Sequence, residues 1–472
     1  MTNRLSQLCD KLAWGMFCVL MADVCIFGAG KLISVGPLSF RMILLALTSL
    51  VCLPVIFKNF KTLLKSKYTW AVGGFGLWLL LSTVIGIRNG NNISLLITDW
   101  KGFLYFILFP SAICLVRSQQ RAQTLTKVMM YAAGVMALVH ILCILCYLWM
   151  PELLDRINVY TKNVHFFYVS YKISEMNVRI SFLSLVCQLI GCAFSVYYQL
   201  QETKPWKRCI YVVITAVCLF AIWLSYTRSI YLAAGVAALG AVITLLIRAD
   251  KATRKGLAAH LCSGLALFFV LIAAFRIGTG TNYFSYGLSR TFAGVTLPSI
   301  SAPADPSVPD DIPTESTDAE TEPEKEPDEA PDEAPDGFHS STLSSDQLRG
   351  ATVSDLIDRI QTSPVWGHGL GTAIPSRPDG LNEYFFLDLG AKTGLVGLAL
   401  YLAPIALMLW SVIQKLKERW QDFAFYGLWF VIILGFVAYS YFTPCMNSSV
   451  GIMCYCCAMA VFQQSSATKN NV

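Results

Sequence analysis

The sequence predicts an all-α polytopic membrane protein with about 12 transmembrane helices, on the strength of its composition and its apolar runs. Of its 472 residues, 55% are hydrophobic and only 14% are charged, whereas roughly a quarter of the residues of a soluble domain are charged. Runs of about 18 or more apolar residues recur along the chain, and each is long enough to cross a bilayer as a helix. The net charge of +6 does not require a nucleic-acid partner, because Lys and Arg in such a protein commonly mark cytoplasmic loops.

The predicted spans follow one another in a regular order. The first begins near Leu12 and lacks a small-residue cleavage site, so we interpret it as a helix and not as a signal peptide. The count of spans depends most on the fourth, which contains Asp99 and Lys101. The spans cover about residues 12–30, 37–57, 68–87, 93–116, 128–150, 179–200, 209–227, 229–247, 258–275, 385–412, 422–443 and 446–463.

Alternate connections between these spans are basic, and this asymmetry predicts the orientation. If the N-terminus is cytoplasmic, all five basic connections lie inside, as the positive-inside rule requires. Twelve spans then return the C-terminus to the inside as well. The connections are KNFKTLLKSK, RSQQRAQTLTK, ETKPWKR, RADKATRK and KLKERW.

Two long connections, 151–178 and 276–382, are expected outside. Neither contains any of the 16 cysteines, so no disulfide framework is expected. The second connection defines three regions: an N-terminal bundle of about 9 spans (1–275), a large extracytoplasmic loop (276–384), and the C-terminal spans with a cytoplasmic tail (385–472).

The large loop has two parts of different character. Residues 302–337 are rich in Pro, Glu and Asp, so we expect a disordered spacer, with calcium binding as the alternative. The segment 352–362 has apolar residues at helical spacing and predicts a short amphipathic helix. Thr352 and Asp355 match a capping box at its start, and Pro364 follows its end.

The sequence GHGLG (367–371) comes after this predicted helix. A nucleotide-binding glycine loop follows a strand, so we expect GHGLG instead to turn the backbone tightly back toward the membrane. The next span should begin with Asn382 as its cap and Glu383 in its first turn. Asp388 and Lys392 are four residues apart and can neutralise each other on one helix face.

Arg228 interrupts a long apolar stretch. The predicted spans put it at a tight outer turn, SYTRS, between the seventh and eighth helices. One interpretation is a snorkelling arginine that lipid headgroups satisfy. The other is a functional role, because an arginine at the outer surface breaks the positive-inside trend and does not set the topology.

The TRS turn, the loop ending in SPVWGHGLG and the span NEYFFL…GLVGL occur in an order that resembles the O-antigen ligase and O-antigen polymerase superfamily, over about residues 179–412. This resemblance implies a GT-C-like bundle in the bacterial cytoplasmic (inner) membrane with its active site on the outer face. It further implies transfer of a glycan from a polyprenyl diphosphate, usually undecaprenyl diphosphate, to an acceptor hydroxyl. Neither a nucleotide sugar nor a cofactor is implied, and no aspartate pair with metal-chelating spacing stands at the outer face.

The resemblance also implies roles for particular residues. Arg228 matches the family's diphosphate-binding arginine, and Arg179 matches a second arginine that opens the preceding span. A loop arginine is matched by Arg290, Arg349 or Arg359, without a choice among them.

Family ligases commonly carry a histidine eleven residues before the first glycine of the GxxG pair. Glu383 occupies that register here, whereas His368 lies too far upstream. Glu383 could act as general base on the acceptor hydroxyl. Asn382, Tyr384, Trp366 and the aromatic residues of 158–171 could contact sugars or the acceptor, although membrane-interface belts are the commoner use of such aromatics.

The acidic residue in the histidine's register favours a polysaccharide polymerase. The alternatives are a ligase, which transfers glycan to a lipid, protein or wall acceptor, and a flippase for lipid-linked oligosaccharide. A flippase would be expected to show mid-span charges and internal repeats. Asp23, Asp99 and Lys101 are the candidate intramembrane charges, and no repeat is evident. A chain-length regulator is a possible partner of a polymerase.

Overall fold

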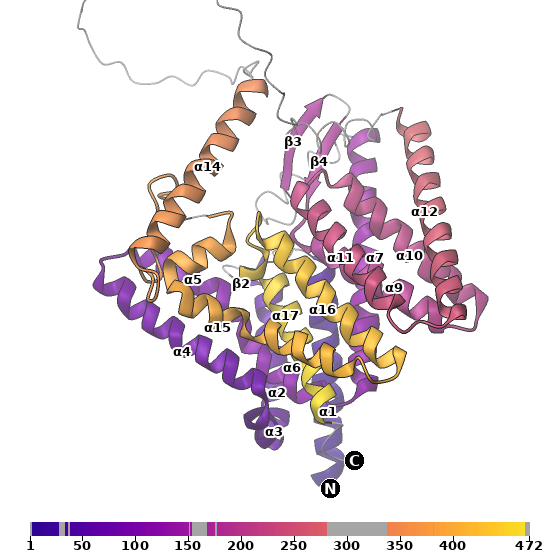
Figure 1. The fold of residues 1–472 in the computed structure, drawn as a ribbon, viewed down its shortest axis with the longest axis horizontal. Coiled ribbons are helices and arrows are strands. Elements are labelled where there is room, and N and C mark those ends of the chain that lie inside the picture. Colours follow the sequence, from indigo (N-terminus) through magenta and orange to yellow (C-terminus); the bar gives the residue numbers. More distant parts are fainter. Residues whose placement is uncertain are drawn as a thin grey trace, which may run out of the picture.

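The computed structural model describes residues 2–27, 34–35, 38–150, 152, 168–174, 177–280, 338–380 and 382–467, and in this part the chain forms a bundle of long helices (Figure 1). Among the described residues, ten helical segments are long and apolar enough to cross a membrane, against the 12 spans predicted from hydropathy. The all-α polytopic class is therefore confirmed. Residues 302–337, Arg290 and most of the aromatic stretch 158–171 lie outside the described residues.

Most of the helices follow the predicted spans, whereas the two short hairpins were not predicted. The α-helices are α1 (Thr2–Ile26), α2 (Phe40–Lys58), α3 (Phe60–Lys65), α4 (Lys67–Arg88), α5 (Ile93–Phe103), α6 (Phe109–Leu115), α7 (Gln119–Trp149), α9 (Gln188–Gln201), α10 (Pro205–Leu224), α11 (Arg228–Leu246), α12 (Lys251–Thr279), α14 (Phe338–Thr362), α15 (Phe385–Lys415), α16 (Trp420–Ser440) and α17 (Ser449–Ala467). The 3₁₀ helices are η1 (Leu104–Leu108), η2 (Leu183–Cys187) and η3 (Cys445–Asn447). Two antiparallel hairpins are formed by β1 (Ser34–Val35) with β2 (Leu38–Ser39), and by β3 (Tyr168–Ser174) with β4 (Asn177–Ser181).

Three predicted boundaries differ from the structure. The fourth span is divided into α5, η1 and α6. The sixth begins with η2 after strand β4, so Arg179 lies in a strand and does not open a helix. The amphipathic helix predicted at 352–362 is the last part of α14, which begins at Phe338.

The capping box predicted for that helix is wrong. Thr352 lies inside α14, where its hydroxyl donates to the Leu348 carbonyl at 2.8 Å. The Asp355 carboxylate accepts from the Ser376 backbone N–H, also at 2.8 Å. Neither side chain binds a free N–H at a helix start, although the helix does end at Thr362, just before Pro364.

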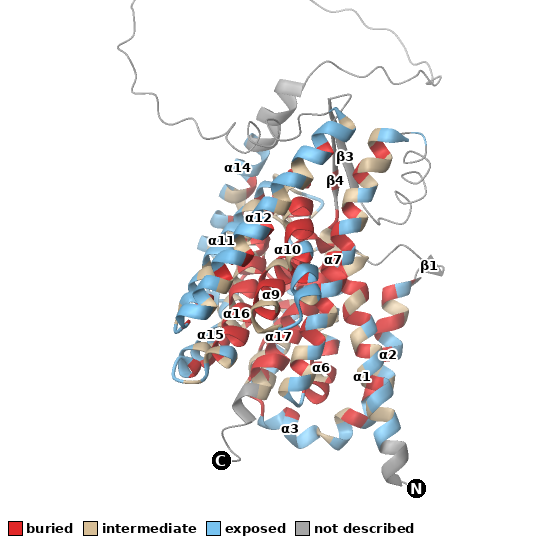
Figure 2. Cartoon of the chain, turned by 90° about the vertical axis from the view of Figure 1, so that its right-hand side faces the viewer, coloured by how far each residue is buried: buried red, intermediate tan, exposed pale blue. Residues whose placement is uncertain are grey.

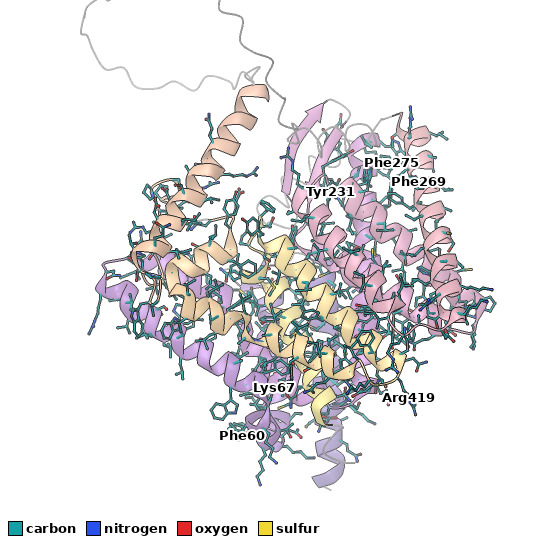
Figure 3. The ribbon with its side chains drawn as sticks, viewed as in Figure 1. Phe60, Lys67, Tyr231, Phe269, Phe275 and Arg419 are labelled. Carbon is teal, nitrogen blue, oxygen red and sulfur yellow. The ribbon has the colours of Figure 1, made fainter. Side chains whose placement is uncertain are left out.

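Both termini lie at one end of the bundle, whereas α14 and the β3–β4 hairpin reach the opposite end (Figure 1). We call the end without the termini the distal end. The basic connections gather at the end with the termini, where Arg121 binds Asp10 and Arg248 donates to the Leu416 and Glu418 carbonyls at 2.6 Å. Figure 3 shows Lys67 and Arg419 toward that end and Phe275 toward the distal end. The basic connections and both termini thus share one end of the bundle, and the assignment of that end to the cytoplasm stays a prediction.

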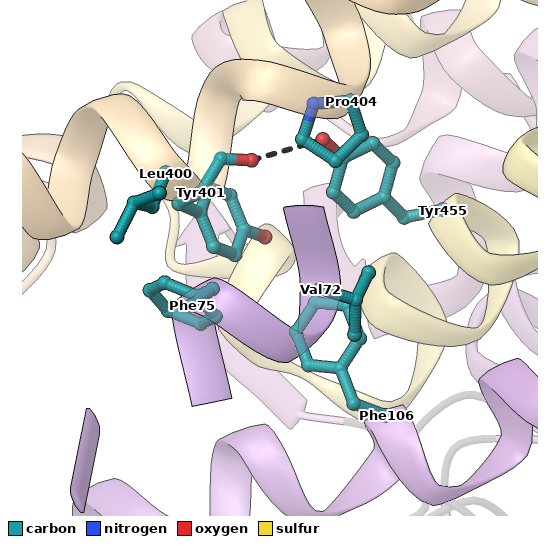
Figure 4. Close-up of a pocket in the computed structure, with 7 residues that line it drawn as sticks. All are labelled: Val72, Phe75, Phe106, Leu400, Tyr401, Pro404 and Tyr455. Carbon is teal, nitrogen blue, oxygen red and sulfur yellow. Dashed lines mark hydrogen bonds between the residues drawn. The ribbon is translucent and has the colours of Figure 1, made fainter. Parts of the chain in front are cut away.

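The core lies around α9, α16 and α17 (Figure 2). In the apolar windows of the α9 and α16 spans, 78% of the residues are buried, against 17% in α12. The apolar side chains exposed on the outer helices are those that a bilayer would cover. An apolar pocket lies between α4, η1, α15 and α17 (Figure 4). The tyrosine hydroxyls that line it are already hydrogen-bonded within the protein: Tyr455 donates to the Tyr401 carbonyl at 2.9 Å, and Tyr401 donates to the Met446 carbonyl at 2.7 Å.

One buried ion pair joins three helices of the N-terminal and C-terminal parts. Arg41 Nε lies 2.7 Å from Asp23 Oδ2, and Arg41 Nη1 donates to Ser449 Oγ at 2.9 Å. The predicted intramembrane charge Asp23 is therefore paired. The pair links α1, α2 and α17, because each of these helices contributes one of the residues.

We predict that Asp23→Ala lowers the free energy of unfolding by about 3–5 kcal/mol, because Arg41 is then buried without its counterion. The double variant Asp23→Ala/Arg41→Met should recover much of this loss, because no charge remains buried there. The check is the temperature at which purified protein loses its monodisperse peak in size-exclusion chromatography. A double variant that is less stable than Asp23→Ala alone would contradict the prediction.

Candidate functional site

Helix α15 is broken near its distal end. Gly394 has φ 68° and ψ 178°, so α15 consists of a short distal piece and a longer piece on either side of it. The segment that contains GHGLG closes the break. His368 N–H donates to the Ala391 carbonyl, Gly369 N–H donates to the Lys392 carbonyl, both at 2.9 Å, and Leu395 N–H donates to the Pro364 carbonyl at 2.8 Å. These bonds satisfy backbone groups that the break frees, as apolar surroundings require.

Glycine is needed where this loop meets the bundle. Gly369 has φ +87°, and a Cβ built there would lie 2.1 Å from the Gly86 backbone nitrogen in α4. Gly367 has φ +69°, and its Cβ would lie 2.5 Å from the nitrogen of Gly394. The prediction that GHGLG turns the backbone tightly back against the bundle is thus confirmed.

A buried cluster of three charges lies beside the break. Lys392 Nζ lies 2.8 Å from Asp99 Oδ1 and 2.8 Å from Asp388 Oδ2. The predicted pairing of Asp388 with Lys392 is confirmed, and Asp99 pairs with Lys392 instead of with the exposed Lys101. The remaining carboxylate oxygens are also bonded: Gly371 N–H donates to Asp99 Oδ2 at 2.8 Å, and the Asn382 amide donates to Asp388 Oδ1 at 2.5 Å.

The expected helix start at Asn382 is wrong. Helix α15 begins at Phe385 with Tyr384 at its N-cap, and no side-chain hydrogen bond caps it. Asn382 uses its amide on Asp388, so it does not serve the first turn of the helix. Glu383 consequently precedes the helix and does not lie in its first turn.

Glu383 lies between two arginines at the distal end. Its Oε2 is 3.1 Å from Arg349 Nε, and its Oε1 is 3.6 Å from Arg377 Nη2. The Glu383 side chain is 38% exposed. Two residues predicted for the site, Glu383 and Arg349, are therefore in contact. Arg377 was missed, although it lies only six positions before Glu383 in the same loop.

The start of α11, where Arg228 lies, is linked to the start of α15 through the turn that follows α16. Tyr384 lies with its ring 6.0 Å from Tyr441 and 6.2 Å from Phe442. The next residue, Thr443, is joined by its hydroxyl to Ser229 Oγ at 3.2 Å. The starts of α15 and of α11 therefore meet the same turn, 441–443.

The start of α11 suits an anion. Arg228 is the first residue of this helix and is exposed. A cation at the positive end of a helix dipole is unfavourable by itself. An anion bound there would be attracted by both the guanidinium group and the positive end of the helix dipole. The preceding Tyr226 has φ 47°, an uncommon conformation for an aromatic residue.

Two other predicted residues, Arg359 and Trp366, are not part of this arrangement. Arg359 lies ten positions beyond Arg349 on α14, about 15 Å along the helix axis, and its carbonyl lies 3.0 Å from His368 Nε2. Trp366 stacks on Trp78 of α4, with ring centroids 5.3 Å apart and planes at 12°. The side chain of Arg179 lies outside the described residues.

No group of three His, Cys, Asp or Glu side chains among the described residues is arranged to hold a metal ion. The polar groups that meet at the distal end are instead guanidinium groups, one carboxylate and a tyrosine ring. This set can bind phosphate and can accept a proton from a hydroxyl.

We predict that Gly369→Ala destabilises the protein, because the new Cβ meets the α4 backbone and the residue needs a positive φ. Gly235→Ala is the matched control, because that glycine lies in α11 with open space around its Cβ position. The thermal transition should fall for the first variant and stay within a few degrees of wild type for the second. Equal transitions for the two variants would contradict the close approach of loop and helix.

Residues 210–402 match the model of the O-Antigen ligase family. No curated protein matches the chain. The matched region runs from α10 into α15 and contains Arg228, Arg349, Arg377 and Glu383. This match supports the resemblance of the region to the O-antigen ligase and O-antigen polymerase superfamily and, with it, glycan transfer in a membrane.

Proposed function

We propose that this protein is a polysaccharide polymerase that transfers a glycan from a polyprenyl diphosphate to an acceptor hydroxyl at the extracytoplasmic face of the cytoplasmic membrane. The observation that carries the proposal is the contact of Glu383 with Arg349 and Arg377, next to the turn that leads to Arg228. Undecaprenyl diphosphate is the lipid that fits this proposal most simply.

Binding of the donor requires positive charge at the diphosphate. Arg228 is exposed at the N-terminus of α11, and no carboxylate pairs with it among the described residues. Arg377 also has an N–H group that can bind the donor. Its Nε is buried and has no hydrogen-bond partner in the described part of the chain. Guanidinium groups aimed at the leaving diphosphate would stabilise the charge that develops there.

Glu383 would act on the acceptor. Without substrate, its carboxylate pairs with Arg349 and Arg377. A diphosphate carries more negative charge than a carboxylate, so the bound donor would take over these arginines and leave Glu383 free as a base. The acceptor oxygen then bonds to the anomeric carbon, the bond from that carbon to the diphosphate breaks, and the hydroxyl proton goes to Glu383.

The distribution of charge supports a site on the extracytoplasmic face. The basic connections gather at the end with both termini, which the positive-inside rule assigns to the cytoplasm. The Glu383 site lies at the distal end with α14. Nucleotide sugars are cytoplasmic donors, so a lipid-linked donor is the one that this location suits.

The products left in a deletion strain should distinguish a polymerase from its alternatives. We expect single repeat units on polyprenyl diphosphate to accumulate on the outer leaflet, with no polymer, because chain extension is lost. The measurement is the surface glycan profile together with the lipid-linked intermediates. Full-length polymer held on the lipid carrier would indicate a ligase instead, and intermediates confined to the inner leaflet would indicate a flippase.

Arg228→Ala and Glu383→Gln should each lower polymer formation by about 100-fold or more, because they remove a phosphate ligand and the base. Arg276→Ala is the matched control, since Arg276 is an exposed arginine near the distal end of α12. The assay is complementation of the deletion strain, with protein levels measured in the membrane.

His368→Ala should have a mild effect in the same assay. The imidazole lies at the end of α14, with Nε2 2.9 Å from Thr362 Oγ1, and not beside Glu383. Complete loss of polymer in His368→Ala with full activity in Glu383→Gln would contradict the proposed base.

A further inference from the structure

We infer that three aspartates, Asp99, Asp355 and Asp388, hold the segment 371–383 in place and so position Arg377 and Glu383 for glycan transfer. This inference rests on the function proposed above. None of the three aspartates is expected to touch the reacting groups. They act as positioning residues on the segment that carries those groups.

The three carboxylates bind the segment at regular points along it. Asp99 Oδ2 accepts from Gly371 N–H at 2.8 Å, Asp355 Oδ2 accepts from Ser376 N–H at 2.8 Å, and Asp388 Oδ1 accepts from the Asn382 amide at 2.5 Å. Arg377 is adjacent to the second point and Glu383 is adjacent to the third. Arg377 and Glu383 are therefore each next in sequence to a residue that an aspartate carboxylate holds.

The three aspartates come from three different helices. Asp99 belongs to α5, Asp355 to α14 and Asp388 to α15. Helix α14 also carries Arg349, so the contact of Asp355 with Ser376 fixes the distance between Arg349 and the segment. The hydrogen bonds from Ser376 hold the pKa of Asp355 below its usual value, so this carboxylate is charged at neutral pH.

Lys392 connects the first and the last of these three contacts. Its ammonium group binds both Asp99 and Asp388 at 2.8 Å, so the two ends of the segment are tied to one buried cation. A buried ion cluster is a costly way to fill space, because well-packed apolar residues are commonly as stable or more so. The cluster is therefore better explained by the polar atoms that it holds, Gly371 N–H and the Asn382 amide, than by stability alone.

The test is a set of matched variants of the full-length protein in nanodiscs. Asp355→Ala removes the acceptor for Ser376 N–H, Asp355→Asn keeps one oxygen as an acceptor, and Asp358→Ala removes an exposed carboxylate three positions along the same helix. Asp99→Asn tests the end of the segment at Gly371: the single oxygen of the amide cannot replace both carboxylate oxygens, which bind Gly371 N–H and Lys392, so the amide nitrogen faces one of these donors, while Lys392 keeps Asp388. The two readouts are amide hydrogen exchange by residue segment and the kcat of transfer from a polyprenyl-diphosphate-linked glycan.

We expect Asp355→Ala and Asp99→Asn to speed exchange within 371–383 at least threefold and to lower kcat about tenfold. Asp355→Asn should recover most of the activity, and Asp358→Ala should match wild type. Unchanged exchange in 371–383 for both Asp355→Ala and Asp99→Asn would overturn the inference. Faster exchange over the whole bundle, together with a lower thermal transition temperature, would also overturn the inference, because the aspartates would then stabilise the fold in general and not this segment in particular. If wild type transfers no glycan, the proposed function fails, and the exchange measurement still decides whether these aspartates hold the segment.

Discussion

The hydrogen bonds that His368 and Gly369 donate to the carbonyls of Ala391 and Lys392 are the constraint on which the distal half of the structure depends. A helix in apolar surroundings can be broken only where other groups bind the backbone that the break frees. The loop can supply those groups because glycines at 367 and 369 let its backbone touch two helices. The break then allows Lys392 to face both Asp99 and Asp388.

From this constraint follows the arrangement at the distal end. The short piece of α15 before Gly394 begins at Phe385, two residues after Glu383, and its N-cap residue Tyr384 packs against the turn that follows α16. That turn also meets Ser229 at the start of α11, next to Arg228. Residues far apart in the chain are thus brought to one end of the bundle, where guanidinium groups and a carboxylate can act on a lipid-linked phosphate and a hydroxyl.

The sequence predicted what depends on local pattern. Hydropathy located the ten long apolar helices of the described residues, and the four-residue spacing of Asp388 and Lys392 predicted their contact, because such residues share one helix face. The contact of Lys392 with Asp99 joins residues 293 apart and leaves no local signal. Thr352 and Asp355 have the spacing of a capping box, but the same spacing occurs inside a helix, so the start of α14 was misplaced. Arg377 was overlooked because its role depends on a tertiary contact with Glu383.

The most direct test is a reaction with purified components. The protein in nanodiscs is given one synthetic repeat unit on polyprenyl diphosphate, which serves as both donor and acceptor, and the products are separated by length. The account predicts lipid-linked chains of two or more units together with free polyprenyl diphosphate, and neither product with Glu383→Gln. Intact single units with active, well-folded wild-type protein would contradict glycan transfer at this site.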